Sequence, residues 1–254
     1  MRVAVITGAA QGIGQAVAIE LAAQGYTPAL NDLKDVAATQ ALLQPATSLP
    51  LIGDLTDAAR VGQFVVAVLE AFGRVDVLVN NAGVSCIAPA SETSAAQFRR
   101  VLEVNLVGAF EITRAFGAVM LRQGSGSIVN IASIAGLTGI AERVAYNASK
   151  HGLIGMTRTL AAEWGGRGVR CNAVCPGWVK TDMDAKDQDA GRYSNADITD
   201  RVPMGRFAAA ADIARAVAFL ADPQLSGFVN GAALPVDGGW TADGSWQSLR
   251  LKQR

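Results

Sequence analysis

The chain has 254 residues, of which 50% are hydrophobic and 17% are charged, so it can build a large core and is not expected to be disordered. Lysine plus arginine equals aspartate plus glutamate at 22 each, which favours neither a nucleic-acid nor a membrane partner. Cys86, Cys171, Cys175 and the single histidine, His151, are too few for a disulfide framework or a metal site.

The first apolar run is broken by Gly8, which makes it too short for a signal peptide or a membrane span. No later run reaches the length of about 18 apolar residues that a spanning helix needs. We therefore expect a soluble, cytoplasmic protein whose thiols stay reduced.

In chain order, short apolar runs alternate with longer segments whose apolar residues recur at helical spacing. The predicted strands are contained in 2–8, 27–32, 49–57, 75–83, 126–133, 168–177 and 231–239. The predicted helices are 12–25, 58–73, 94–123, 145–164 and 211–222. This alternation predicts an α/β fold, a doubly wound parallel sheet with helices on both faces.

One segment, 181–207, is long, irregular and rich in Asp, Gly and Asn. It fits a substrate lid better than a domain boundary. With no internal repeat or low-complexity linker, we predict a single domain over 1–254.

The sequence TGAAQGIG at 7–14 lies between the first predicted strand and helix. Gly8, Gly12 and Gly14 would allow a tight turn and close approach of a phosphate to the helix N-terminus. A glycine pattern alone is weak, because turns need glycine anyway. After the first strand of an α/β chain, it indicates dinucleotide binding.

Asp32 ends the second predicted strand, where a carboxylate can accept hydrogen bonds from the adenosine ribose and repel a 2′-phosphate. The alternative is an ordinary turn residue at a strand end. A 2′-phosphate would need a cation nearby, and neither Gln11 nor Leu33 is basic. NAD is therefore expected rather than NADP.

Taken together, the motifs resemble the short-chain dehydrogenase/reductase family over nearly the whole chain. They are TGAAQGIG at 7–14, DLT at 54–56, NNAG at 80–83, VNLVGAF at 104–110, NIASIAG at 130–136, YNASK at 146–150, PGWVKT at 176–181 and LPVDGG at 234–239. The resemblance implies a Rossmann-type fold, a small-molecule substrate and a homotetramer.

The resemblance also implies the residues that contact the cofactor. Asp54 and Leu55 would contact adenine, and Thr181 would bind the nicotinamide carboxamide. The full set is Gly8, Gln11, Gly12, Ile13, Gly14, Asp32, Leu33, Asp54, Leu55, Asn81, Ala82, Gly83, Tyr146, Lys150, Pro176, Gly177, Val179 and Thr181.

Asn105, Ser133, Tyr146 and Lys150 match the family's catalytic residues in order and spacing. On a helix, Tyr146 and Lys150 would share one face. Tyrosine has an ordinary pKa of about 10, and the cations of Lys150 and oxidised nicotinamide would lower it towards neutrality. Tyr146 would then act as the general base in oxidation and the general acid in reduction.

Two of these residues have simpler alternatives. Ser133 would hold the substrate oxygen against Tyr146, or it would be a strand-end serine that satisfies the backbone. Asn105 would lie inside a helix, where asparagine is unfavourable. The family implies a water-linked proton relay from Asn105 to Lys150, and a buried structural amide is the alternative.

Substrate contacts are expected from Ser133, Arg143, Tyr146 and Trp178. Arg143 could pair with a carboxylate, or it could be an ordinary solvated arginine. The tail 240–254 carries Trp240, Trp246, Arg250, Lys252 and Arg254. It would either fray or pack on a neighbouring subunit.

These features predict an NAD-dependent dehydrogenase or ketone reductase of carbohydrate metabolism. Its substrate would be a secondary alcohol or ketone in a sugar, a polyol or a sugar-derived hydroxy or keto acid. One alternative is a 3-oxoacyl thioester reductase for acyl carrier protein or CoA substrates, which would prefer NADPH. A cofactor-binding regulatory protein is a further alternative.

Overall fold

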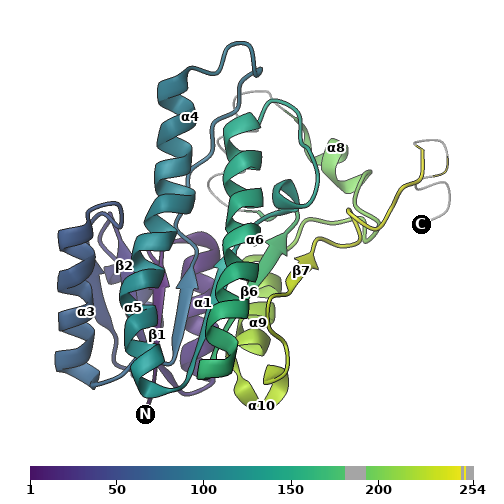
Figure 1. The fold of residues 1–254 in the computed structure, drawn as a ribbon. Coiled ribbons are helices and arrows are strands. Elements are labelled where there is room, and N and C mark those ends of the chain that lie inside the picture. The colour runs from purple at the N-terminus through teal and green to yellow at the C-terminus, as the bar shows by residue number, and fades with distance from the viewer. Residues whose placement is uncertain (181–192, 247–248, 250–254) are drawn as a thin grey trace.

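The computed structural model describes residues 1–180, 193–246 and 249. Its described part is built on a parallel seven-stranded sheet in the order β3-β2-β1-β4-β5-β6-β7 (Figure 1), which confirms the predicted doubly wound α/β fold. The strands are β1 (Arg2–Thr7), β2 (Tyr26–Asp32), β3 (Leu49–Ile52), β4 (Val77–Asn80), β5 (Gly126–Ile131), β6 (Val169–Pro176) and β7 (Ala233–Val236).

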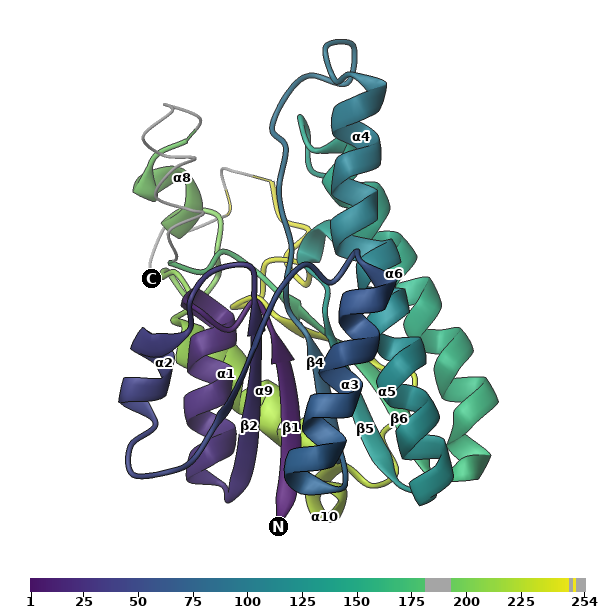
Figure 2. The same cartoon turned by 90° about the vertical axis from the view of Figure 1, so that its left-hand side faces the viewer.

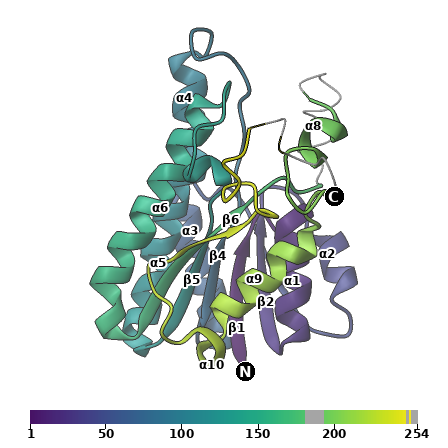
Figure 3. The same ribbon diagram turned by 90° about the vertical axis from the view of Figure 1, so that its right-hand side faces the viewer.

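Helices cover both faces of the sheet. Figures 2 and 3 show α3, α5 and α6 on one face and α1 and α9 on the other, with α4 extending beyond the sheet from the start of α5. The α-helices are α1 (Gly12–Ala23), α2 (Ala37–Leu42), α3 (Ala58–Phe72), α4 (Ala95–Leu102), α5 (Ala109–Gln123), α6 (Val144–Trp164), α8 (Asn195–Thr199), α9 (Ala210–Ala221) and α10 (Pro223–Ser226). Short 3₁₀ turns span Ile134–Gly136 and Gly165–Arg167, and a π-helical turn spans Glu103–Gly108.

Local sequence signals set the helix ends. Asp57 caps α3 by accepting hydrogen bonds from the backbone N–H groups of Ala59 and Arg60. Gly73 ends the same helix in the left-handed region at φ 71°. Ser94 and Gln97 form a capping box at the start of α4.

The sheet separates two hydrophobic cores. Val3 and Val5 of β1 pack into the core under α3 and α5, whereas Ala4 and Ile6 pack into the core under α1 and α9. Successive side chains of a strand point to opposite faces, so a strand buried on both sides must be apolar throughout. Each fully buried valine or isoleucine contributes about 1.5–3 kcal/mol.

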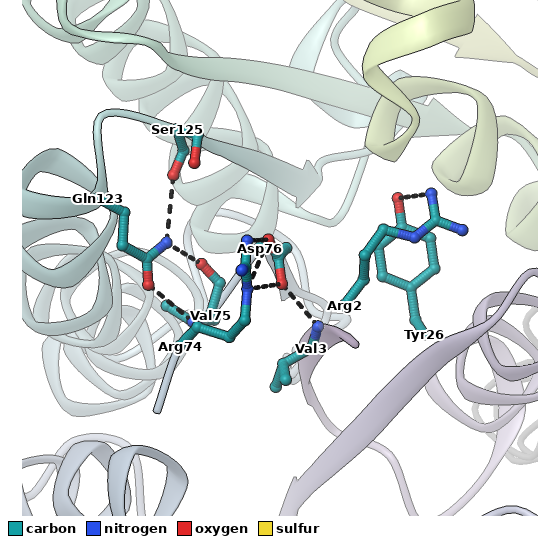
Figure 4. Close-up of polar contacts among 8 residues, drawn as sticks. All are labelled: Arg2, Val3, Tyr26, Arg74, Val75, Asp76, Gln123 and Ser125. Atoms are coloured by element: carbon teal, nitrogen blue, oxygen red, sulfur yellow. Dashed lines mark hydrogen bonds and ion pairs between the residues drawn. The ribbon is translucent and has the colours of Figure 1, made fainter. Parts of the chain in front are cut away.

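At the amino ends of the strands, a polar network ties β1 to the neighbouring connections (Figure 4). Asp76 accepts a hydrogen bond from the Val3 N–H at 2.8 Å and pairs with Arg74 at 2.6 Å. Gln123 donates to the Val75 carbonyl at 2.7 Å and accepts from the Val75 N–H at 3.0 Å. This network lies at the edge of the sheet opposite the candidate site.

The predicted helix 94–123 is three consecutive helical segments, because the π-helical turn lies between α4 and α5. The third strand lies within its predicted range 49–57, and the predicted fourth strand, 75–83, was too long at both ends. β3 ends at Ile52, and Asp54 then accepts a hydrogen bond from the Thr56 N–H in a turn. β4 ends at Asn80, after which the Asn81 side chain bonds to the backbone of β1. The short helices α2, α8 and α10 were not predicted.

The residues on either side of the predicted lid, 181–207, are hydrogen-bonded to each other. The Ala208 N–H donates to the Trp178 carbonyl at 2.9 Å, and the Lys180 N–H donates to the Ala208 carbonyl at 3.2 Å. Residues 181–192 of this segment lie outside the described residues, and 193–207 contain α8.

The continuous helical stretch Ala95–Gln123 is long and apolar enough to cross a membrane by length and composition alone. Its most apolar window is 56% buried in the fold, and α5 packs against α3 and the sheet. A buried core helix passes the same test, so this stretch is weak grounds for a membrane span.

Candidate active site

The glycine loop joins the carboxyl end of β1 to α1. Gly8 has φ 66°, and a Cβ added at Gly14 would lie 2.1 Å from the Gly8 carbonyl oxygen. The sharp turn therefore needs glycine at both positions. Helix α1 follows at Gly12, and its N-cap residue, Gln11, makes no side-chain capping bond. The first turn of α1 thus offers backbone N–H groups and a positive dipole end to an anion.

The carboxyl ends of β1 and β4 are locked together beside this loop. Thr7 Oγ1 accepts hydrogen bonds from the N–H groups of Asn81 and Ala82, each at 2.9 Å. Asn81 Nδ2 donates to the carbonyls of Thr7 at 2.9 Å and Gly8 at 3.1 Å. In the sheet, β1 and β4 are the neighbours at which the order of successive strands reverses, and ligands bind at such a point in open α/β sheets.

Asp32 lies at the carboxyl end of β2, as predicted. One carboxylate oxygen accepts from the Ala10 N–H and the other from the Lys34 N–H, each at 3.0 Å. Lys34 Nζ in turn donates to Gln11 Oε1 at 3.2 Å. Lys34 therefore lines the cavity beside Asp32. The prediction of NAD from Gln11 and Leu33 did not consider this cation.

Asp54 and Leu55 form the next part of the wall. The Thr56 N–H and the Thr56 hydroxyl both donate to Asp54, and the backbone bond in particular lowers the pKa of this carboxyl below its ordinary value. Leu55 is buried against Gly108, where an added Cβ would lie 2.0 Å from Leu55 Cδ1. Asp54 is therefore an anion held in a fixed orientation.

Asn105 lies in the π-helical turn and is 1% exposed. Its Oδ1 accepts from the Val84 N–H at 2.8 Å, and its Nδ2 donates to the Val84 carbonyl at 2.9 Å and to Ser149 Oγ at 3.1 Å. A Cβ added at Gly83 would lie 3.2 Å from Asn105 Oδ1 and 3.8 Å from Lys150 Nζ. Asn105 thus braces the loop after β4 against the helix that carries Lys150.

Tyr146 and Lys150 both project from the first turns of α6. Lys150 Nζ lies 5.4 Å from the centre of the Tyr146 ring and donates to the Ile131 carbonyl at 2.7 Å. Lys150 is 4% exposed, and this burial lowers its pKa from 10.5 to about 8. The ammonium is still mostly charged at neutral pH, close to the tyrosine.

Ser133 follows β5 and caps the 3₁₀ turn Ile134–Gly136. Its Oγ accepts a hydrogen bond from the Ala135 N–H at 3.1 Å. A hydroxyl can donate one bond while it accepts others, so this cap leaves the Ser133 proton for another acceptor. Ser133 thus has the backbone role named as the simpler alternative, and it also lines the cavity.

Trp178 and Tyr193 form an aromatic wall of the cavity, and Trp240 packs near Trp178. The Trp178 ring centre lies 4.9 Å from Tyr193 and 5.9 Å from Trp240. The Arg143 guanidinium lies 5.6 Å from the Trp178 ring centre, and Arg143 Nη1 donates to Ser85 Oγ at 3.2 Å.

The start of the tail packs on its own chain. The Arg201 guanidinium stacks 4.5 Å from the Trp240 ring centre and donates to the Asp243 carbonyl at 3.0 Å. The packing of the tail on a neighbouring subunit stays a prediction, and Arg250, Lys252 and Arg254 lie outside the described residues.

One cavity of about 510 Å³ unites most of the predicted residues. Those that line it are Gly8, Gln11, Gly12, Ile13, Asp32, Leu33, Asp54, Leu55, Asn81, Ala82, Gly83, Ser133, Arg143, Tyr146, Lys150, Pro176, Gly177, Trp178 and Val179. Gly14 and Asn105 do not line it, because the first packs on the loop backbone and the second lies behind Gly83. Thr181 lies outside the described residues.

Several lining residues were missed in the sequence, among them Lys34, Val84, Arg100, Ile140 and Tyr193. Lys34 and Val84 had a usable signal, since Lys34 follows Asp32 by two positions and Val84 directly follows Gly83. The others reach the cavity through tertiary packing.

The cavity suits an extended dinucleotide. The glycine loop lines it through Gly8, Gln11, Gly12 and Ile13, and a Cβ at Gly8 would come within 2.8 Å of Asn81 Nδ2, so glycine is needed there for the loop to pack on the end of β4. Asp32 and Asp54 lie at one end, and Ser133, Tyr146 and Lys150 lie at the other. Residues Gly8 to Ile13 would hold the pyrophosphate, and Asp32 would bind the adenosine ribose.

Comparison with known proteins agrees with this geometry. Residues 8–241 match the protein family described as enoyl-(acyl carrier protein) reductase. D-threitol dehydrogenase of Mycolicibacterium smegmatis is 42% identical over 94% of this chain and 93% of its own length. The 3-oxoacyl-acyl-carrier-protein reductase of Thermotoga maritima is 37% identical over 94% of this chain and 97% of its own length.

A longer relative is also similar. An uncharacterized short-chain type dehydrogenase/reductase of Sinorhizobium fredii is 44% identical over 94% of this chain, which spans 43% of that relative's length.

Solved structures match closely as well. The crystal structure of levodione reductase has a TM-score of 0.91 and 36% identity, and the match covers 95% of this chain and 98% of that chain. A Beutenbergia cavernae protein described as an NAD(P)-dependent gluconate 5-dehydrogenase, solved with bound NADP at low occupancy, has a TM-score of 0.88. It is 42% identical, and the match covers 95% of this chain and 97% of that chain.

Proposed function

Because the chain belongs to the short-chain dehydrogenase/reductase family, we propose that it is an NAD-dependent oxidoreductase acting on a secondary alcohol or ketone of a small polar substrate. The observation that carries this proposal is that Ser133, Tyr146 and Lys150 line one cavity with the glycine loop and Asp32. A proton-handling group and a nucleotide cradle thus share one cleft.

The side chains divide the chemistry between them. When bound, nicotinamide accepts a hydride in oxidation or supplies one in reduction. In oxidation Tyr146 Oη takes the proton of the substrate hydroxyl, and in reduction it returns a proton to the carbonyl oxygen. Ser133 Oγ donates to that oxygen and fixes its position. The Lys150 ammonium, 5.4 Å from the Tyr146 ring, favours the tyrosinate that oxidation needs.

Two features bear on the choice between NAD and NADP. The Asp32 carboxylate, held by the Ala10 and Lys34 N–H groups, would oppose a 2′-phosphate and favours NAD. Lys34 beside Gln11 would attract a phosphate and favours NADP. We propose NAD because the carboxylate is fixed by two backbone bonds, whereas Lys34 is an exposed side chain held by one.

A small polar substrate is supported by the names of two relatives, D-threitol dehydrogenase and gluconate 5-dehydrogenase, each 42% identical to this chain. The aromatic wall of Trp178 and Tyr193 suits the carbon face of a sugar or polyol chain. A sugar, a polyol or a sugar-derived hydroxy or keto acid therefore remains the proposed class.

The second candidate is a 3-oxoacyl thioester reductase. The Thermotoga maritima relative and the presence of Lys34 at the ribose end favour it. Such an enzyme would reduce acetoacetyl-CoA with NADPH, so one cofactor comparison separates the two functions.

We also propose a cytoplasmic homotetramer. Apolar side chains exposed on the α5 and α6 side, Val107 at 40%, Phe110 at 44% and Val144 at 39%, support contacts between subunits. Light scattering after gel filtration tests this assembly.

The test of function is a screen of NADH formation with polyols, sugars and sugar acids, with acetoacetyl-CoA plus NADPH as the competing reaction. We expect turnover with NAD and at least one polyol, sugar or sugar acid, and loss of that turnover by at least about 100-fold in Tyr146→Phe. Absence of NAD-linked turnover with every member, or unchanged turnover in Tyr146→Phe, contradicts the proposal.

A further inference from the structure

The aromatic wall of Trp178 and Tyr193 lies on the substrate side of the cavity. The register of the sheet sets Ile131 of β5 beside Val174 of β6. Ser133 and Trp178 lie just beyond the ends of these two strands, so they leave the sheet as neighbours. The adenosine end of the cavity follows β2 and β3, which lie on the other side of the sheet order. The aromatic wall therefore belongs to the part of the site that receives the substrate oxygen.

This wall is held by three residues that lie outside the cavity. Arg201, Trp240 and Asp243 are not among the described residues that line it. We propose that these three residues, the Trp240 support, fix Trp178 and Tyr193 in position and thereby set the affinity for the substrate. The inference rests on the proposed function and adds positioning residues to it.

The Trp240 support and the wall form a closed ring of contacts. The Trp178 ring centre lies 4.9 Å from that of Tyr193 and 5.9 Å from that of Trp240. The Arg201 guanidinium lies 4.5 Å from the Trp240 ring centre. Tyr193 precedes α8 and Arg201 follows it, so this short helix completes the ring. Because every member has contacts on two sides, loss of one contact loosens both residues of the wall.

Asp243 fixes Arg201 over the indole of Trp240. Arg201 Nη2 donates to the Asp243 carbonyl at 3.0 Å, and Arg201 Nη1 lies 3.6 Å from Asp243 Oδ2. The two side chains are only 21% and 11% exposed, so their attraction is screened less than that of a surface pair. A cation over the face of an indole adds a further attraction. The guanidinium thus joins the chain after α8 to the loop after β7.

The loop after β7 is a firm base for this contact. The Asp237 carboxylate accepts hydrogen bonds from the Gly239 N–H at 2.9 Å and from the N–H and hydroxyl of Thr241 at 2.9 Å and 2.6 Å. The Met204 N–H donates to the Gly238 carbonyl at 3.1 Å, so the chain beyond α8 is tied to the same loop by its backbone. The Trp240 support is therefore anchored at both of its ends.

A fixed wall favours substrate binding. Each mobile side chain that must be ordered on binding weakens the affinity by about two- to tenfold. Trp178 and Tyr193 offer apolar ring surface to the carbon-bound hydrogens of a sugar or polyol. Tyr146 and Lys150 belong to α6 and not to the Trp240 support. The support should therefore act on substrate affinity and leave the proton transfer unchanged.

Substitutions of Arg201 test the inference. Arg201→Met keeps a long apolar side chain over Trp240 and removes the charge, whereas Arg201→Lys keeps the charge. Arg201→Met combined with Asp243→Asn removes both charges, so that neither is left buried alone. The matched control is Arg206→Met, which breaks the 2.7 Å pair of Arg206 with Asp212. Arg206 also follows α8 but is not among the described residues that line the cavity.

Three measurements separate the wall, the substrate and the cofactor. Near-ultraviolet circular dichroism of the ligand-free protein reports on the Trp178–Trp240 pair, whose band is identified by its loss in Trp240→Phe. Steady-state kinetics with NAD use those polyols, sugars and sugar acids that the wild-type enzyme oxidises. The affinity for NADH is measured by fluorescence titration without substrate.

We expect Arg201→Met and the double variant to weaken the Trp178–Trp240 band. KM for the substrate should rise by about tenfold, while kcat and the affinity for NADH change by less than about threefold. Arg201→Lys should fall between, because lysine keeps a cation over the indole but loses the planar fork. Arg206→Met should match the wild type in all three measurements.

The inference is wrong if the band and KM are unchanged in both Arg201→Met and the double variant. It is also wrong if the affinity for NADH falls as much as that for the substrate, or if Arg206→Met has the same effects. A wild-type enzyme that oxidises no member of the panel would contradict the proposed function and the role in substrate affinity. A weakened band in Arg201→Met would then still support the structural part of the inference, and an unchanged band would overturn that part too.

Discussion

Asn105 and Val84 are joined by two hydrogen bonds, in which the amide of Asn105 pairs with both the N–H and the carbonyl of Val84. Replacing Asn105 by alanine would leave two partly buried backbone groups of Val84 without these partners, at a cost of up to about 1–3 kcal/mol each. We expect Asn105→Ala to lower the Tm by several degrees and kcat by at least about tenfold, because the loop beside Lys150 loses its brace. Thermal unfolding and steady-state kinetics measure the two effects.

Asn80 supplies the control. It is also a buried amide, and its Nδ2 donates to Thr113 Oγ1 and Asn130 Oδ1, each at 2.7 Å, but it does not line the cavity. Asn80→Ala should lower the Tm without lowering kcat per folded molecule. An equal loss of kcat in both variants would refute the specific role of Asn105.

The depressed pKa of Lys150 predicts a pH-dependent stability. Burial lowers this pKa from 10.5 to about 8, so the charged lysine opposes folding below pH 8 and this penalty disappears as the pH rises from about 8 to 10.5. The free energy of unfolding of the wild type, relative to Lys150→Met, should therefore rise over that range. Urea unfolding at pH 7, 8, 9 and 10 tests it, and a constant difference would be inconsistent with the buried charge.

Asp32 and Lys34 should act in opposite directions on cofactor choice. Asp32→Asn removes the negative charge that faces a 2′-phosphate, and we expect the ratio of kcat/KM for NADP to that for NAD to rise at least about tenfold, or about 1.4 kcal/mol. Adding Lys34→Ala to this variant should reverse part of the gain, since the remaining cation is lost. If the ratio does not move in Asp32→Asn, the carboxylate does not set the preference.

The polar network at the amino ends of the strands should affect stability alone. Asp76→Ala leaves the Val3 N–H without its 2.8 Å acceptor, so we expect a loss of about 1–3 kcal/mol, a Tm lower by roughly 3–8 °C and an unchanged kcat/KM. Arg74→Ala removes only a pair whose arginine side chain is 47% exposed and should cost less than about 1 kcal/mol. A drop in kcat/KM without a drop in Tm for Asp76→Ala would contradict this separation.

The parallel sheet could be predicted from the sequence because the strands are apolar on both faces. In the longer helices, apolar residues recur at helical spacing. The short helices escaped because segments such as Ala37–Leu42 and Pro223–Ser226 are shorter than two helical turns and show no period. Asn105 is instructive, since its poor helix propensity correctly marked an unusual position. Its π-helical turn and its pairing with Val84 depend on tertiary contacts that no local pattern encodes.

Tyr146 and Lys150 lie where their spacing predicted, four positions apart on one helix. The residues that meet in the cavity wall were harder to predict from the sequence. Ser85 and Arg143 are 58 positions apart and meet through folding of two loops. Trp240 belongs to a tail expected to fray or to reach another subunit, yet it packs near Trp178 of its own chain.

The bridge between Val179 and Ala208 gives the fold a modular boundary. The chain enters and leaves the segment 181–207 through this one junction, and the described part of the segment packs on the fold through the buried side chains of Ile198 and Val202. A new segment that keeps these two anchors would give the same strand ends a different neighbour, and so would change which molecules reach the proposed site without rebuilding the sheet.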